Sequence, residues 1–218
     1  MRFSFFTILL LLALLAAGFI GMIAYWTFSP TTGDKASETP KALSLNTQPP
    51  TRPVLSSTDP IRGDLNASFS IIEFGDFQCA ACAEVEPLLR KVLDQYPGRV
   101  KLVWKDAPNS RLHPLAQRAA EAAHCAGEQG KFWEYHDRLL DQGQSLTETG
   151  LSLAARELGL NGSSFAECLE SGRATELVTR SLNEALLLRV DATPYFFLGE
   201  SRISGAVNEE ELKKMLTQ

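Results

Sequence analysis

Two cysteines, Cys79 and Cys82, stand three positions apart in the stretch FGDFQCAACAEVEP, where an apolar strand pattern changes into a helix pattern. A cysteine in the first turn of a helix lies near unpaired backbone N–H groups and the positive end of the helix dipole, and both stabilise a thiolate. A second cysteine one turn later can attack a mixed disulfide formed by the first. The spacing therefore predicts thiol–disulfide exchange, with Cys79 as the nucleophile and Cys82 as the resolving thiol.

The same spacing has two other uses, which the residues alone leave open. C-x-x-C is also half of a zinc site, although the other half would need cysteine or histidine at comparable spacing. The remaining candidates are scattered along the chain: His113, His124, Cys125, His136 and Cys168. A structural bridge is the third use, because four cysteines allow three pairings and spacing does not choose among them.

The elements that position the pair follow from the hydrophobic pattern, which predicts an α/β fold. Residues 69–74 are apolar and rich in β-branched and aromatic side chains, as in a buried strand, and residues 100–104 form a second such strand. The helix between them has one apolar face made by Val85, Leu88, Leu89, Val92 and Leu93. Helical patterns follow near 114–126, 131–141, 148–158, 163–170 and 174–189, and then a hairpin of 195–198 with 202–204 and a helix over 209–216.

The first thirty residues predict a membrane segment. No charged residue occurs from Phe3 to Phe28, a run longer than the approximately 20 residues that span a bilayer. We expect an uncleaved anchor in residues 1–30, with a cleaved signal peptide as the alternative. Arg2 favours a cytoplasmic start, which places the rest of the chain outside the cytoplasm.

Two further segments follow the membrane run. Residues 31–56 are rich in Pro, Thr and Ser and predict a flexible linker, and residues 57–218 predict the folded domain. The net charge of −5 without a basic block gives no reason to expect a nucleic-acid partner.

Three stretches together resemble a known family. IIEFGDFQCAAC is similar to the active-site region of the thioredoxin superfamily, and more closely to its DsbA-like branch of extracytoplasmic thiol–disulfide oxidoreductases. HPLAQRAAEAAHCAGEQGKFWEYHDRLL resembles the helical insertion of that branch, and VDATPYFFLGE resembles its cis-proline loop. The resemblance implies a thioredoxin fold with a helical insertion at about 107–190. It also implies cysteine-containing protein substrates, a redox partner that recycles the pair, and no metal or cofactor.

The resemblance also implies roles for other residues. Glu73 matches the acid that lies beneath the buried cysteine in family members, where it is thought to assist proton transfer, and a carboxyl buried there should have a raised pKa. Thr193 and Pro194 match the cis-proline loop, which pairs with a substrate peptide as an added strand. Cys125 and Cys168 match a structural disulfide of some members, and closing a loop of about 43 residues would stabilise the fold by roughly 4 kcal/mol.

The dipeptide Ala80-Ala81 departs from the family pattern. Strongly oxidising members carry a histidine between the cysteines that helps to hold the thiolate, so its absence predicts a higher pKa for Cys79 and a less oxidising pair. Isomerase or reductase activity is therefore an alternative to oxidation. Two other classes also stay open, a non-enzymatic metal carrier and a peptide-binding module on the same fold.

Overall fold

The computed structural model describes residue 22 and residues 50–216. The chain divides into two units, 1–46 and 47–218, and the second carries the fold described below. The predicted membrane segment and most of the predicted linker lie outside the described residues, so the structure does not test either. Over the part of the chain that is described, no helix has both the length and the apolar character needed to cross a membrane.

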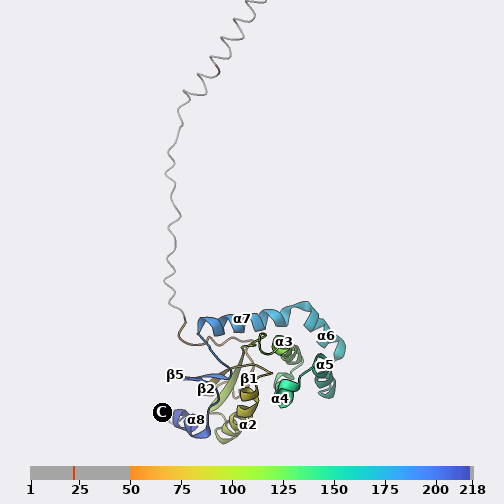
Figure 1. The fold of residues 1–218 in the computed structure, drawn as a ribbon. Coiled ribbons are helices and arrows are strands. Elements are labelled where there is room, and N and C mark those ends of the chain that lie inside the picture. Colours follow the sequence, from red (N-terminus) through yellow and green to blue (C-terminus); the bar gives the residue numbers. More distant parts are fainter. Residues whose placement is uncertain (1–21, 23–49, 217–218) are drawn as a thin grey trace, which may run out of the picture. The chain divides into compact units, whose positions relative to one another are not determined.

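A five-stranded mixed sheet forms the centre of the folded unit, with the strand order β1-β3-β2-β4-β5 (Figure 1). Strands β2 (Phe69–Gly75) and β3 (Val100–Asp106) are parallel, whereas each of the other neighbouring pairs is antiparallel. The other strands are β1 (Ile61–Gly63), β4 (Tyr195–Leu198) and β5 (Ser201–Ser204). Strand β2 is therefore central, and its carboxyl end leads directly to the two cysteines.

Helices α2 (Ala80–Gln95) and α8 (Glu209–Leu216) share a buried core with one face of this sheet. The core joins residues of both helices to three strands: Ile71, Val85, Leu89, Leu102, Phe196 and Leu212. Because successive side chains of a strand point to opposite faces, Glu73 shares the face of Ile71 and Phe74 points the other way. Glu73 is thus on the sheet face that α2 covers.

Five helices lie between β3 and β4 and form the inserted subdomain: α3 (Ala116–Gly127), α4 (Phe132–Gln142), α5 (Glu148–Glu157), α6 (Gly162–Ser171) and α7 (Arg173–Leu187). A 3-10 turn, Gly143–Ser145, follows α4. Helix α3 is almost entirely buried because its alanines let neighbouring helices approach closely. The end of α7 returns to the sheet, where Ala185 packs in one cluster with Phe74 and Phe197 on the face opposite to α2.

The predicted order of elements is confirmed, with one addition and small shifts of boundaries. Strand β1 was not predicted because three residues, IRG, carry no periodicity. Helix α3 begins at Ala116, two residues after Pro114. At α8 the backbone N–H of Glu211 donates to the Asn208 side chain at 2.9 Å, and the backbone N–H of Asn208 donates to the Glu211 carboxylate at 3.1 Å. This reciprocal pair is a capping box and explains where the last helix starts.

Candidate active site

Cys79 and Cys82 lie where β2 passes into α2. Cys79 is the N-cap residue of the helix, and its backbone N–H donates to the Asp76 carbonyl oxygen at 3.0 Å. Cys82 is in the first turn. Both thiols are free, but their exposure differs, since Cys79 is 8% exposed and Cys82 is fully buried. The helix start thus presents one sulfur to the surface and keeps the other beneath it.

The two thiols have opposite electrostatics. Hydrogen bonds lower the pKa of Cys79 to about 5, first from the Cys82 thiol and then from the Thr193 side chain and the backbone of Cys82 and Ala81, against a smaller opposing effect of burial. Burial, together with the hydrogen bond to Cys79 and the negative charges of Glu73 and Cys79, raises the pKa of Cys82 well above its ordinary value. At neutral pH the outer sulfur is therefore a thiolate and the inner one a thiol that donates to it.

Glu73 lies on β2 opposite Trp104 of β3 and Phe196 of β4. It is completely buried, and neither of its carboxyl oxygens has a hydrogen-bond partner among the residues that the structure describes. Burial raises the pKa of Glu73 well above its ordinary value, and the charges of Glu86 and Cys79 add to the effect. Because a buried carboxylate without donors is costly, the carboxyl holds its proton readily. When Glu73 is ionised, its negative charge contributes to the raised pKa of Cys82.

The loop before β4 brings a distant part of the chain to the cysteines. The Thr193–Pro194 peptide bond is cis, and the Cys79 thiol donates to the Thr193 carbonyl oxygen at 3.2 Å. This oxygen can only accept, so it favours the thiol form of Cys79, in opposition to the donors that favour the thiolate. The Pro194 carbonyl oxygen accepts from the backbone N–H of Gly205 at 2.8 Å, which ties the loop to the end of β5.

Cys125 and Cys168 form a disulfide that joins α3 to α6, with an S–S distance of 1.99 Å and a Cα–Cα distance of 5.6 Å. Both residues are buried. The structure thus divides the four cysteines into one bonded pair in the helical insertion and one free pair at the start of α2.

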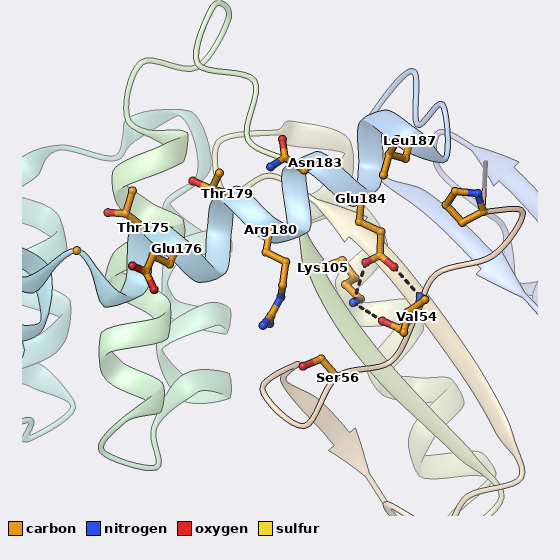
Figure 2. Close-up of a pocket in the computed structure, with 12 residues that line it drawn as sticks. Val54, Ser56, Lys105, Thr175, Glu176, Thr179, Arg180, Asn183, Glu184 and Leu187 are labelled. Carbon is orange, nitrogen blue, oxygen red and sulfur yellow. Dashed lines mark hydrogen bonds and ion pairs between the residues drawn. The ribbon is translucent and has the colours of Figure 1, made fainter. Parts of the chain in front are cut away.

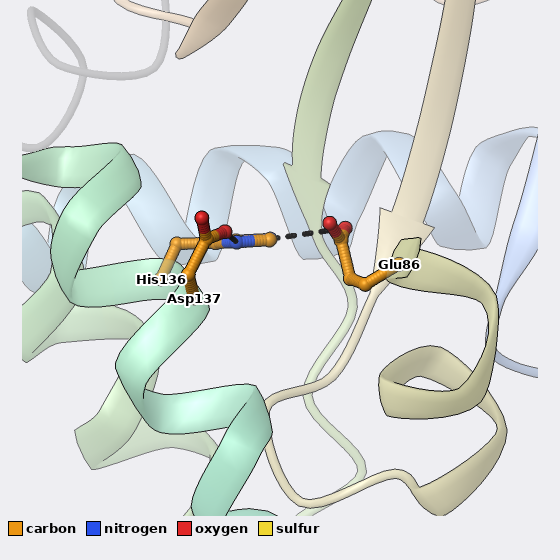
Figure 3. A group of neighbouring side chains, drawn as sticks. All are labelled: Glu86, His136 and Asp137. Atoms are coloured by element: carbon orange, nitrogen blue, oxygen red, sulfur yellow. Dashed lines mark hydrogen bonds and ion pairs between the residues drawn. The ribbon is translucent and has the colours of Figure 1, made fainter. Parts of the chain in front are cut away.

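A cluster of Glu86, His136 and Asp137, of which the first two are buried, has the ligand types of a metal site (Figure 3). His136 Nε2 lies 3.6 Å from Glu86 Oε1, and its Nδ1 lies 3.0 Å from Asp137 Oδ1. However, two guanidinium groups already lie against these carboxylates. Arg62 contacts Asp137 at 2.6 Å and Glu86 at 3.7 Å, and Arg90 contacts Asp137 at 3.2 Å. The positive charge that the acids require is supplied by arginine, so the cluster does not favour a cation.

His124 and His136 have partners within the packed helices and sheet. His124 Nε2 lies 2.6 Å from the buried Asp106 carboxylate, and His136 packs with Phe77, Trp104 and other aromatic rings. Burial acts to lower the pKa of His124, but the charge of Asp106, its hydrogen bond and the charge of Asp59 together raise it. The sequence did not predict these pairings, because residues 18 positions apart come together only through the packing of α3 on β3.

A cavity of about 820 Å³ lies along α7 (Figure 2). Its lining includes Lys105, which is buried and contacts three groups: the Asp59 carboxylate at 2.8 Å, the Glu184 carboxylate at 2.9 Å and the Val54 carbonyl oxygen at 2.9 Å. These contacts hold residues 54–59 against β3 and α7. Cys79, Cys82, Glu73, Thr193 and Pro194 are not among the residues that line this cavity.

Comparisons with known proteins agree with this architecture. A protein-family model described as thioredoxin matches residues 55–218. A thioredoxin-like oxidoreductase from Silicibacter pomeroyi is 25% identical with a TM-score of 0.67, over 74% of this chain and 92% of that chain. The thiol–disulfide exchange protein alpha-DsbA2 from Wolbachia pipientis is 21% identical with a TM-score of 0.67, over 74% and 87% of the two chains. Oxidised BdbD from Bacillus subtilis is 19% identical with a TM-score of 0.66, over 73% and 91%.

The curated relatives are longer proteins. A Na⁺/H⁺ antiporter NhaA 1 from Salinispora arenicola is 37% identical over 165 residues, which are 76% of this chain and 25% of the relative. The chain thus spans about a quarter of the length of that protein. The family match instead covers most of this chain, and its sheet, helical insertion and cis-proline loop are all present. The chain therefore belongs to the thioredoxin family, and the solved structures named above share its fold.

Proposed function

We propose that this domain catalyses thiol–disulfide exchange on cysteine-containing proteins through Cys79 and Cys82. The observation that carries the proposal is the contrast between the two thiols. Cys79 is partly accessible with a pKa of about 5, whereas Cys82 is buried with a raised pKa. Attack on a disulfide requires a thiolate, and its release by a resolving thiol requires a second sulfur within reach. A purely structural C-x-x-C has no need of this asymmetry.

In the oxidising direction, a substrate thiolate attacks the Cys79 sulfur of the Cys79–Cys82 disulfide. That S–S bond breaks, Cys82 leaves as a thiolate that takes up a proton, and a mixed disulfide joins Cys79 to the substrate. A second substrate thiolate then attacks the substrate sulfur of the mixed disulfide and releases Cys79 as a thiolate. Two electrons pass from the substrate to the pair. Reduction of a substrate disulfide follows the same steps in reverse.

We propose that Glu73 accepts the proton of Cys82 and returns it during exchange. A thiol with a raised pKa is a poor nucleophile and a poor leaving group until a proton moves, so a buried acceptor and donor next to it accelerates both directions. The carboxyl of Glu73 lies under α2, and its charge affects the pKa of Cys82. Because the pKa of Glu73 is itself raised, it is closer to the pKa of a thiol than that of an ordinary carboxyl group. Thr193 and Pro194 form the edge on which a substrate peptide pairs as an added strand.

Oxidation of substrate thiols is the direction that the thiolate favours. A stabilised Cys79 thiolate stabilises the reduced pair and so makes the disulfide more oxidising. The donors to Cys79 are the Cys82 thiol, the Thr193 side chain and backbone groups, none of which depends on the side chains between the cysteines. The expectation from Ala80-Ala81, that the pKa of Cys79 lies above that of strongly oxidising members, stays a prediction. Isomerase or reductase activity is the alternative direction.

The domain acts outside the cytoplasm, where disulfides persist and where an unidentified redox partner would recycle the pair. The apolar run of residues 3–28 would anchor it to the membrane, and residues 31–56 would form the tether. Among the structural relatives is a protein described as a periplasmic thioredoxin-like protein, from Salmonella enterica, with 23% identity and a TM-score of 0.64 over 73% of this chain and 88% of that chain. Antiport is a property of relatives that this chain matches over about a quarter of their length, and we do not extend it to this chain.

The direct test measures oxidation of a reduced, unfolded substrate protein and reduction of a protein disulfide by the purified chain. Cys79→Ser should abolish both activities, and Cys82→Ser should accumulate a mixed disulfide with the substrate on Cys79. Cys125→Ala with Cys168→Ala is the matched control and should retain exchange. Full activity of Cys79→Ser would refute the assignment of Cys79 as the nucleophile. No turnover by the wild type would favour a peptide-binding module, and stoichiometric metal in the reduced protein that is lost on Cys79→Ser would favour a metal carrier.

A further inference from the structure

Asp76 lies three residues before Cys79 and has no assigned role, yet its groups contact every part of the redox turn. Its carbonyl oxygen accepts from the Cys79 backbone N–H at 3.0 Å, and its backbone hydrogen-bonds to the Cys82 sulfur. Its side-chain Oδ1 accepts from the Gln78 backbone N–H at 2.8 Å. The carboxylate is 1% exposed in spite of its charge. A buried acid with this many partners is costly to keep unless its geometry serves the site.

The other carboxylate oxygen of Asp76 contacts a different segment, the loop that follows β3. Asp76 Oδ2 accepts from the Asn109 backbone N–H at 2.9 Å and lies 2.8 Å from His113 Nδ1. A carboxylate can only accept, so the histidine carries its proton on Nδ1. A single side chain therefore connects the cysteine turn, 33 residues earlier in the sequence, to this loop.

Two further hydrogen bonds join the same segments. The Ala107 backbone N–H donates to the Gly75 carbonyl oxygen at 2.8 Å, and the Leu115 backbone N–H donates to Gln78 Oε1 at 2.7 Å. The loop is thus fixed at both of its ends independently of Asp76. Loss of the Asp76 carboxylate would release the middle of the loop and leave the fold in place.

The middle of the loop forms one wall of a cavity of about 600 Å³. Residues 107–111 line one side, and the end of α7, with Leu182 and Leu186, lines another. The cavity ends at Thr193, whose carbonyl oxygen is 3.2 Å from the Cys79 sulfur. A substrate joined to Cys79 by a mixed disulfide has its cysteine at this sulfur, so the polypeptide that flanks it passes beside Thr193 and reaches this cavity.

We propose that Asp76 is a positioning residue that holds the loop of residues 107–113 against the redox turn and so fixes the wall on which polypeptide substrates bind. His113 supports it as the third donor to the carboxylate. This inference rests on the proposed exchange function and adds a specificity role to it. Small disulfides do not extend past the sulfur, so their reaction does not depend on the wall.

Asp76→Asn is the sharpest test, because it preserves shape and removes the charge. An asparagine oxygen can still accept from Gln78, but its NH₂ group then faces the backbone N–H of Asn109, which can only donate. The change therefore detaches the loop and keeps the turn. Asp141→Asn, at an exposed position on α4, is the matched control. His113→Ala removes one donor and serves as a second variant should Asp76→Asn not fold.

The expected result for Asp76→Asn is a KM for a cysteine-containing peptide raised by about tenfold, as for loss of a hydrogen bond to a charged group. The rate of reaction with glutathione disulfide and the pKa of Cys79 should stay within about twofold and about half a unit of the wild type. Hydrogen exchange at the Asn109 amide should become faster. His113→Ala should change the peptide KM in the same direction by less, and Asp141→Asn should change nothing.

Two outcomes would overturn the inference: an equal loss of rate with the peptide and with glutathione disulfide, or an unchanged peptide KM together with an unchanged Asn109 amide. If instead the wild type reacts with neither substrate, the proposed function fails. The exchange of the Asn109 amide would still show whether Asp76 holds the loop, so the two failures are distinguishable.

Discussion

The potential of the Cys79–Cys82 pair should depend on pH with a bend near pH 5. Reduction of the disulfide takes up two electrons and, when both thiols are protonated, two protons. The potential then falls by about 59 mV per pH unit. Above the pKa of Cys79, which is about 5, the reduced pair keeps only the Cys82 proton. The slope should therefore halve to about 30 mV per pH unit and stay there to alkaline pH, because the pKa of Cys82 is raised.

The size of the effect at neutral pH follows from the same shift. A free thiol has a pKa of about 8.5 and is mostly protonated at pH 7. The pKa of Cys79 is about 5, so pH 7 lies about two units above it. Each unit stabilises the reduced pair by about 1.4 kcal/mol, which for a two-electron couple is about 30 mV. We therefore expect the pair to be about 60 mV more oxidising at pH 7 than the same pair with an ordinary Cys79.

The assay equilibrates the chain with glutathione buffers from pH 4 to pH 8, quenches with acid and alkylation, and corrects for the pH dependence of glutathione itself. The rate of Cys79 alkylation against pH should give the same midpoint. Glu73→Gln is the control, because the Glu73 carboxyl also titrates and could itself bend the curve of potential against pH. If Cys79 is the source of the bend, this variant should keep it near pH 5. A slope of about 59 mV that continued unchanged through pH 7 would refute the reasoning, because it would mean that Cys79 is protonated there.

Three further predictions concern stability. Burial raises the pKa of Glu73 above an unfolded value of about 4.3, so its contribution to stability is complete below about pH 4.3 and is lost as pH rises through the folded pKa. The free energy of unfolding of Glu73→Gln, measured in denaturant against pH, should lack this decline of about 1.4 kcal/mol per pH unit. Parallel pH profiles of wild type and variant would contradict the prediction. Replacing Cys125 and Cys168 by alanine should lower the free energy of unfolding by about 4 kcal/mol for the 43-residue separation, measured without reductant; an unchanged denaturation midpoint would contradict the chain-entropy argument. Gly75→Ala would place a Cβ 2.1 Å from a ring carbon of Trp104 and should cost about 1–3 kcal/mol, which a calorimetric melt unchanged from wild type would disprove.

The sequence predicted the elements of the fold because their signals are local. The apolar alternation before Cys79 and the helix period after it depend only on neighbours, and both are confirmed in β2 and α2. Strand β1 was not predicted because it is three residues long and is defined by its pairing with β3 rather than by its own composition. The buried position of Glu73 was suggested by its apolar neighbours, and the complete absence of hydrogen-bond partners for its carboxyl could be known only from the packing above it.

Contacts in the candidate site between residues far apart in the sequence could not be predicted from local sequence patterns. Thr193 is 114 residues from Cys79, and only a resemblance to a family connected them before the structure placed the carbonyl oxygen beside the sulfur. The contacts of Asp76 with Asn109 and His113 had no signal of any kind in the sequence, because a loop without periodicity supplies both donors. Glu86 has an ordinary place on a helix in the sequence, and its burial against Arg62 follows from how α4 and β1 approach α2.

The alanines between the cysteines show where the reactivity of Cys79 originates. Neither side chain can donate a hydrogen bond, yet the pKa of Cys79 is about 5, below the value of about 7 for thioredoxin and above about 3.5 for DsbA. The donors are the Cys82 thiol, the Thr193 side chain and backbone N–H groups at the start of α2, and the backbone groups among them come with the fold itself. The fold thus sets a low starting value, and the two residues between the cysteines adjust it. A donor introduced there would lower the pKa of Cys79 further and raise the potential by up to about 30 mV per unit, which makes this dipeptide the natural place for tuning the pair.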